Sequence, residues 1–148
     1  MSEAYYGHVG PDLPIHLQPD WDDVILRPYW DALLHGRMIV QSCDACYTVQ
    51  WPPRGACAAC GSIATGWREI PGRGIVYSWT QIAHARDPYS AARSPYSVAV
   101  IAHEEHPIRF LGAIRLPEGA VPQIGRKVRM STVAIGEHAY PVWEEIAG

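Results

Sequence analysis

The hydrophobic positions of this chain divide it into a short helical part and a longer part made of strands. Over residues 21–33, apolar side chains recur at intervals of three and four residues, which is the spacing of one face of an α-helix. Asp20 is placed to cap the first turn. Pro28 has no amide hydrogen, so the pattern predicts either a break near 26–27 or a helix that starts at Pro28 and ends near His35.

Alternating apolar and polar positions follow and predict a structure that is otherwise β. Two short strands, 38–41 and 47–51, flank the first of two cysteine pairs. Beyond residue 70 the pattern predicts no helix and about five strands, at 75–82, 96–103, 108–115, 127–135 and 140–146. Five short strands at this spacing are typical of a small closed barrel, of which the OB-fold is the leading example.

The first 20 residues form a separate part. Prolines at 11, 14 and 19 forbid a long helix and predict an extended arm. The first ten residues have the character of a disordered tail, whereas Ile15 and Leu17 give the rest apolar surface that can dock on a partner. We therefore expect four parts: an arm over 1–20, a helical segment over 21–36, a cysteine-rich ribbon over 37–66 and a barrel over 67–148.

The chain has four cysteines, spaced as two Cys-x2-Cys pairs with ten residues between them: Cys43, Cys46, Cys57 and Cys60. Each pair can turn two sulfurs toward one point, and together they supply the four thiolates of a closed tetrahedral zinc site. The alternatives are two disulfides or four free thiols. Iron is the rival metal, but the ten-residue insert is short for a rubredoxin electron carrier. The spacing predicts structural zinc.

Composition limits what the chain can bind. Its 148 residues, 48% of them hydrophobic, suffice for one ordinary domain or two very small ones. With 12 basic and 15 acidic residues the net charge is -3, which argues against nucleic acid as the main ligand. No apolar run approaches the roughly 20 residues that cross a bilayer. Residues 1–6 lack the features of a signal peptide, so we expect a cytoplasmic protein, where paired cysteines favour metal over disulfides.

No catalytic group is evident in the sequence. The cysteines are assigned to metal, and no Gly-x-Ser-x-Gly motif occurs. The pairs Glu104–Glu105 and Glu144–Glu145 are adjacent, so on a strand their carboxylates point to opposite faces. The seven histidines are scattered without an evident partner. We expect no catalysis by this chain alone.

The helical segment has more aromatic surface than a chain of this size readily covers. Two interpretations stay open, packing on its own domain, which is the commoner use of such a stripe, and docking on a partner. The residues concerned are Trp21, Ile25, Tyr29, Trp30 and Leu33.

The order of these parts resembles a known family, the acyl-CoA-associated proteins with an N-terminal helix, a rubredoxin-like zinc ribbon and a C-terminal OB-fold. The resemblance covers roughly residues 21–146, and each motif alone is less specific than the combination. The motifs that carry it are Tyr29-Trp30-Asp31-Ala32-Leu33, Gln41-Ser42-Cys43, Cys46, Pro53-Arg54, Cys57-Ala58-Ala59-Cys60-Gly61, Gly72-Arg73-Gly74-Ile75-Val76-Tyr77-Ser78-Trp79-Thr80, Pro95-Tyr96 and Ile124-Gly125-Arg126-Lys127-Val128.

This resemblance implies a small non-catalytic subunit that binds a thiolase-like protein. The heteromeric complex, expected to hold two copies of each chain, makes or breaks carbon–carbon bonds of acyl-CoA thioesters, as in thiolases and in the aldolases of steroid side-chain or aromatic breakdown. Candidates to meet the phosphates of CoA are Arg54, Arg73, Arg86 and Arg93, of which the last two lie in a predicted irregular loop over 83–95. For each arginine the alternative is a solubilising surface charge.

A second class of function also stays open. OB-folds with zinc ribbons can bind single-stranded nucleic acid by stacking bases on aromatic side chains, for which Tyr77, Trp79 and Tyr96 are available. The acidic balance and the lack of a basic stripe count against this function.

Overall fold

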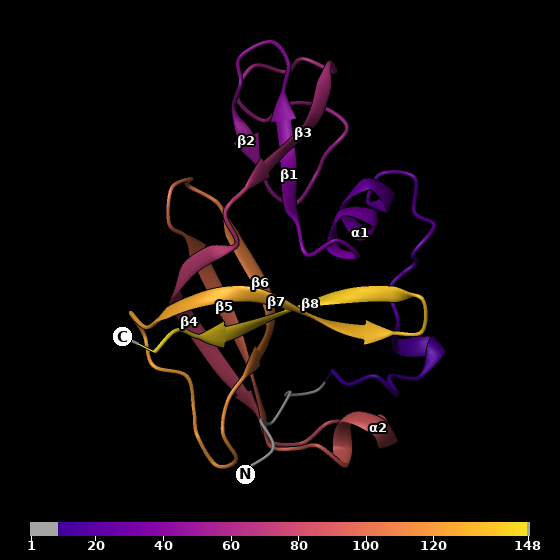
Figure 1. Ribbon diagram of the computed structural model, residues 1–148, viewed down its shortest axis with the longest axis vertical. Helices are drawn as coiled ribbons and strands as arrows, with labels where there is room; N and C mark the ends of the chain where they lie inside the picture. The colour runs from indigo at the N-terminus through magenta and orange to yellow at the C-terminus, as the bar shows by residue number, and fades with distance from the viewer. Residues whose placement is uncertain (1–8, 148) are drawn as a thin grey trace.

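The computed structural model describes residues 9–147, so expectations for residues 1–8 lie outside the described part. A small sheet stands above a barrel, and α1 lies beside both, against β1 and β8 (Figure 1). The elements are η1 (Ile15–Leu17), α1 (Arg27–Leu33), β1 (Met38–Cys43), β2 (Val49–Gln50), β3 (Thr65–Ile70), β4 (Arg73–Ile82), α2 (Pro88–Ala91), β5 (Tyr96–His103), β6 (Arg109–Arg115), β7 (Lys127–Ile135) and β8 (His138–Glu145).

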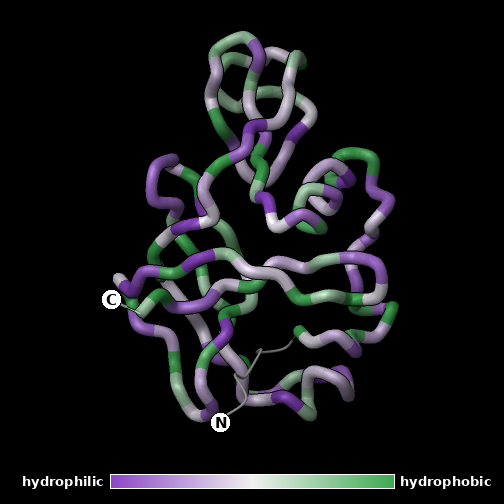
Figure 2. Tube along the Cα trace, viewed as in Figure 1, coloured by the Kyte–Doolittle hydropathy of each residue, from purple (hydrophilic) through white to green (hydrophobic). Residues whose placement is uncertain are grey.

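The last five strands close a barrel in the order β4-β5-β6-β8-β7, with β7 pairing back to β4. All pairs are antiparallel except β6 with β8, which run parallel through Ala113↔Val142 and Ile114↔Trp143. The predicted five-stranded barrel is confirmed. Apolar and polar residues are interspersed along its strands, as Figure 2 shows, because one side of each strand faces the interior.

The barrel interior and the small sheet share one core. Ile101, Phe110 and Trp143 fill the barrel, and Met38 and Ile70 of the small sheet join the same buried cluster. Residues of the small sheet and of the barrel therefore form one core from which water is excluded. Gly74 lies where β4 meets both β5 and β7. A Cβ at this position would stand 2.5 Å from the carbonyl oxygen of Ala102, so only glycine fits.

The helix begins near the predicted proline but is capped differently. Pro28 occupies the first turn of α1, as predicted. Asp20 does not cap it: among residues 9–147, its carboxylate accepts from the amide of Asp22, at 3.1 Å, which lies before the helix. The carboxylate of Asp23 accepts from the amides of Ile25 and Leu26 and so closes the turn before the helix. α1 itself has Leu26 as its N-cap, without a hydrogen bond from the side chain of that residue.

The described part of the arm packs on this chain's own barrel. Val9 and Leu13 are 2% and 7% exposed, and they lie against the outer barrel surface with Ala113, Val133 and Val142. Of the two residues expected to dock on a partner, Leu17 is half-buried against this cluster, whereas Ile15 remains 86% exposed.

The arm is also fixed by polar contacts. The Asp12 carboxylate accepts from the hydroxyl of Tyr89 at 3.0 Å and pairs with the Arg93 guanidinium, also at 3.0 Å. These contacts, the Tyr89 hydrogen bond first, hold the pKa of Asp12 below its usual value. These contacts hold the arm against the segment that follows β4.

Three local features differ from the sequence expectations. The strand predicted over 47–51 is reduced to β2, because the first cysteine turn occupies its start. β3 pairs with β1 and belongs to the small sheet, although it crosses the expected boundary at residue 66. The segment 83–95 contains α2, where Asp87 accepts from the amide of Ser90 and Pro88 takes the first turn.

Candidate metal centre

The four cysteine sulfurs meet at one end of the small sheet. Cys43 ends β1, Cys46 follows in the turn to β2, and Cys57 and Cys60 come from the connection between β2 and β3. All four sulfurs lie within 4.8 Å of one another, and the pairs Cys43–Cys60 and Cys46–Cys57 are both 3.6 Å apart. Zn–S bonds of about 2.3 Å in a tetrahedron require sulfur separations of about 3.8 Å, so the donor set fits zinc.

Hydrogen bonds favour the thiolate form at two of the four cysteines, Cys43 and Cys46. The amide of Ala45 donates to Cys43 Sγ at 3.4 Å, and the amide of Ala59 makes the same contact with Cys57 Sγ. Backbone amides, that of Cys46 above all, lower the pKa of Cys43. The contact with the Thr48 hydroxyl, 3.1 Å away, lowers the pKa of Cys46 to about 6. The Ser62 backbone lowers the pKa of Cys60, but the neighbouring sulfurs, Cys43 first, raise it to about 11, so a bound cation must displace that proton.

Two buried glutamines hold the second cysteine turn against the first. Gln41 of β1 is 5% exposed, and its side chain accepts from the Arg54 amide at 2.8 Å and donates to the Arg54 carbonyl at 2.7 Å. Gln50 of β2 accepts from the amide of Ala58 at 2.9 Å and donates to Gln41. Sequence analysis missed both residues, because a polar residue within a short strand ordinarily points to solvent.

The two cysteine turns repeat one geometry with different residues. The amide of Tyr47 donates to the Cys43 carbonyl at 3.0 Å, and that of Gly61 donates to the Cys57 carbonyl at 2.9 Å. Both residues have positive φ, 62° and 79°. Glycine accepts this conformation freely, but in other residues it costs about 1 to 2 kcal/mol. Tyr47 carries that strain although its side chain is 70% exposed.

The four candidate arginines are not brought together. Arg54 lies on the ribbon, Arg73 is the first residue of β4, and Arg86 lies beyond the other end of this strand, whose ten residues span about 30 Å. Those three side chains are exposed. Arg93 is engaged within the chain, since it pairs with Asp12 and its guanidinium lies 3.5 Å from the centre of the Tyr89 ring. The structure therefore does not bring all four to a single phosphate, and a contact of each with CoA stays a prediction.

Three of the five candidate interface residues are covered by the chain itself. Tyr29, Trp30 and Leu33 are 5%, 8% and 1% exposed, and they pack with Ile39 and Ala139. Burial raises the pKa of Tyr29. Trp21 is half-buried against Trp30 and stacks on His138 at 4.5 Å. Ile25 remains 49% exposed. On this segment, a partner protein could therefore contact Ile25 and its exposed neighbours, but not the buried aromatic residues.

The aromatic residues considered for nucleic acid do not form a stacking surface. Trp79 packs against the barrel core, and Tyr96 is buried. Tyr77 is 47% exposed, but the Arg109 guanidinium lies 3.8 Å from the centre of its ring. A groove of stacked bases on these three residues is not supported.

His103 proves to be buried, where scattered surface histidines were expected. It is 7% exposed and its Nε2 lies 2.7 Å from the Pro71 carbonyl. Its Nδ1 accepts from the amides of Glu105 and His106. With both ring nitrogens occupied, the side chain joins the end of the ribbon to the β5–β6 turn and is not placed for acid–base chemistry.

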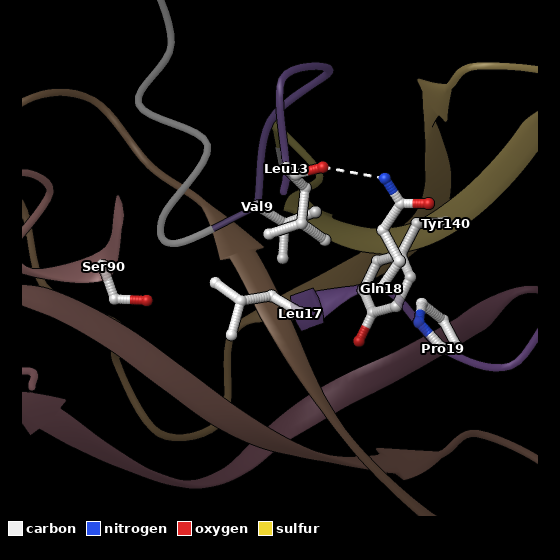
Figure 3. Close-up of a pocket in the computed structure, with 7 residues that line it drawn as sticks. All are labelled: Val9, Leu13, Leu17, Gln18, Pro19, Ser90 and Tyr140. Atoms are coloured by element: carbon white, nitrogen blue, oxygen red, sulfur yellow. Dashed lines mark hydrogen bonds between the residues drawn. The ribbon is translucent and has the colours of Figure 1, made fainter. Parts of the chain in front are cut away.

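A cavity of about 290 Å³ lies beneath the arm (Figure 3). Gln18, whose side chain donates to the Leu13 carbonyl at 2.8 Å, closes one side. The lining residues are Val9, Leu13, Leu17, Gln18, Pro19, Ser90 and Tyr140. None of them is charged, so this cavity is not built to hold the phosphates of CoA.

Across residues 9–147, no helix is both long and apolar enough to span a membrane.

The fold and the site together define a class of protein, a rubredoxin-like zinc ribbon joined to a C-terminal OB-fold. Two sequence models of one family match the two parts in order. The ChsH2 rubredoxin-like zinc ribbon domain matches residues 30–63, and the ChsH2 C-terminal OB-fold domain matches residues 67–133. The matches cover more than half of the chain, and it belongs to the ChsH2 family.

Solved structures agree with this assignment. The chain is similar to a chain of the Ltp2-ChsH2(DUF35) aldolase, with 29% identity, a TM-score of 0.71, and coverage of 86% of this chain and 98% of that one. A DUF35-family protein from Sulfolobus solfataricus has a TM-score of 0.56 and 18% identity over 85% of this chain and 96% of its own, which is a likeness of fold alone.

A curated relative is similar over a shorter region. The probable enoyl-CoA hydratase alpha subunit of Thermomonospora curvata is 37% identical over 73 residues, which is 49% of this chain. The match spans 22% of that relative, so the two proteins share one part rather than a whole architecture.

Proposed function

We propose that this chain is a non-catalytic subunit of a heteromeric complex that makes or breaks carbon–carbon bonds of acyl-CoA thioesters. Its partner is a thiolase-like protein that carries the catalytic groups, and the two chains assemble as two copies of each. The similarity to the ChsH2 chain of an Ltp2-ChsH2 aldolase is the observation that carries this proposal, because it extends over 98% of that chain.

The contents of the site support a structural rather than a catalytic role. Four thiolates fill all positions of a tetrahedral zinc ion, so no position is left for substrate or water. Glu144, one of the conspicuous acidic residues, is paired with Arg115 at 3.0 Å and with Arg129 at 2.9 Å. The four cysteines, His103 and Glu144 are thus engaged in the metal site or in contacts within the fold.

A contribution to holding CoA is proposed for Arg54 and Arg73. Arg54 and Arg73 lie on the ribbon and at the start of β4, on the side of the barrel that carries the ribbon (Figure 1). Arg86 lies beyond the other end of β4 and would meet a different part of the complex. Replacing Arg54 and Arg73 with Ala is expected to raise the KM for acyl-CoA of the assembled complex, with the Arg86→Ala variant as the control.

The test of the proposal is co-expression with the thiolase-like protein encoded beside this chain. A stable complex should co-purify, and acyl-CoA cleavage or condensation should require both chains. If the chain purifies alone, well folded, and leaves the solubility and activity of that protein unchanged, the accessory role is wrong.

A subunit of an enoyl-CoA hydratase is the second candidate, favoured by the match to the Thermomonospora curvata protein. The same purified complex distinguishes the two. Addition of water to an enoyl-CoA without change in carbon chain length would support the hydratase, and a change in chain length would support the carbon–carbon chemistry.

A further inference from the structure

The end of the ribbon that carries the sulfurs, residues 44–47 and 58–64, is here called the ribbon tip. Its residues are exposed except for the half-buried Ser62. Asp44 is its only charged side chain, and alanine, glycine, tyrosine and isoleucine supply most of the surface. Two large apolar side chains project from it, Tyr47 at 70% and Ile63 at 83% exposure. Exposed surface with few charges and large apolar side chains is typical of the centre of a protein interface.

The stability of the fold does not explain why an exposed tyrosine occupies the strained position 47. The matching position of the other cysteine turn is Gly61, which adopts the same positive φ without strain. A ring that is 70% exposed gains little from burial that would offset the strained backbone. Tyrosine at this position therefore makes the free ribbon less stable than glycine would. A compensating gain in free energy must come from a contact that forms only when another molecule is bound.

The charge around this ring limits the kind of partner. Four thiolates around a divalent zinc ion leave excess negative charge at the sulfur cluster, and Asp44 adds one more. The sulfurs of Cys46 and Cys60 belong to exposed residues, so this charge is presented outward. A nucleic acid backbone would be repelled, whereas a protein surface with basic side chains around an apolar pocket would be attracted.

We propose that the ribbon tip is a docking surface in which the Tyr47 ring enters an apolar pocket of the partner protein, with basic side chains of that protein facing Asp44 and the thiolates. The inference rests on the proposed function for the identity of the partner, the thiolase-like subunit. Aromatic rings that become fully desolvated in such pockets carry a large share of the binding free energy of an interface.

The experiment uses the zinc-loaded full chain and the purified thiolase-like protein encoded beside it, with binding measured by titration calorimetry. Tyr47→Gly and Tyr47→Asn both accept positive φ and remove the ring. Each is expected to raise Kd at least about tenfold. Both variants should keep their zinc, and Tyr47→Gly should have a Tm equal to or higher than that of the natural chain. Ile124→Ala, at a 71% exposed position on the barrel, is the matched control and should leave Kd unchanged.

Several outcomes overturn the proposal. If the natural chain binds and Tyr47→Gly binds within about twofold of it, the docking role is wrong while the proposed function stands. A loss of zinc or a fall in Tm in Tyr47→Gly would show that the ring stabilises the ribbon instead. If the natural chain does not bind the thiolase-like protein at all, both proposals fail. Tyr47-dependent binding of a labelled single-stranded oligonucleotide would replace the protein partner with nucleic acid.

Discussion

At the scale of single residues, the surroundings of a glycine decide whether a larger residue can replace it. Gly74 and Gly55 look alike in the sequence, and neither has a positive φ. Gly74 faces the backbone of Ala102 across the β4–β5 pair, whereas nothing lies within 4 Å of a Cβ built at Gly55. Alanine at either position reduces backbone freedom to a similar extent, but only at Gly74 does the added methyl group lack space. Comparing the two alanine variants therefore isolates the effect of space.

Gly74→Ala is expected to lower the free energy of unfolding by about 2 to 3 kcal/mol, because the added methyl group must displace backbone in the barrel wall. Urea denaturation of the zinc-loaded protein measures the change. Gly55→Ala is the control and should stay within about 0.5 kcal/mol of the natural chain. Equal midpoints for the two variants would contradict the close approach of β4 and β5.

The sequence predicted those residues whose role is local. The cysteine spacing fixed the metal ligands, because each pair acts through its own turn. Gln41 and Gln50 escaped prediction because their partners are backbone groups of another turn, at Arg54 and Ala58. Tyr47 escaped prediction because its strain lies in its backbone conformation, which the residue type does not indicate.

At the scale of elements, the ribbon depends on contacts between its two cysteine turns. Gln50→Leu keeps the approximate size of the side chain but leaves the Ala58 amide without its acceptor. This change is expected to weaken zinc binding by about tenfold, as loss of an outer-layer hydrogen bond commonly does. Competition with a chromophoric chelator measures the affinity. Gln81→Leu, at an exposed position of β4, is the control, and equal affinities of the two variants would contradict the role of Gln50.

The elements that sequence patterns missed are those defined by distant partners. β3 is recognisable only from its pairing with β1. The arm's burial depends on an outer barrel surface built from β6, β7 and β8, about a hundred residues further along the chain. Periodicity reports which side of an element is apolar, and it does not report what covers that side.

At the scale of the whole molecule, the zinc site and the barrel are joined by the core they share. Met38, Val40 and Ile70 belong to the ribbon sheet, yet they are buried with the barrel interior. Disorder in the ribbon would therefore expose one wall of the barrel core to water.

Removal of zinc by a chelator is accordingly expected to lower the Tm of the whole chain by about 10 °C or more, rather than to unfold the ribbon alone. Thermal unfolding followed by far-ultraviolet circular dichroism, with and without the chelator, measures the shift. Readdition of zinc should restore the original transition. A barrel transition unchanged by chelation would show that the two parts fold independently.

The place of β8 in the barrel has a consequence for how the chain is made. β8 lies between β6 and β7 and is the last of the five barrel strands to be synthesised. On the ribosome, the cysteine ribbon is complete some 70 residues before the barrel can close, so metal can be loaded onto a nascent chain whose remaining strands still lack their final neighbour. A nascent chain that has emerged from the ribosome as far as residue 137 would carry the complete ribbon and an open sheet, whose unpaired strand edges favour aggregation.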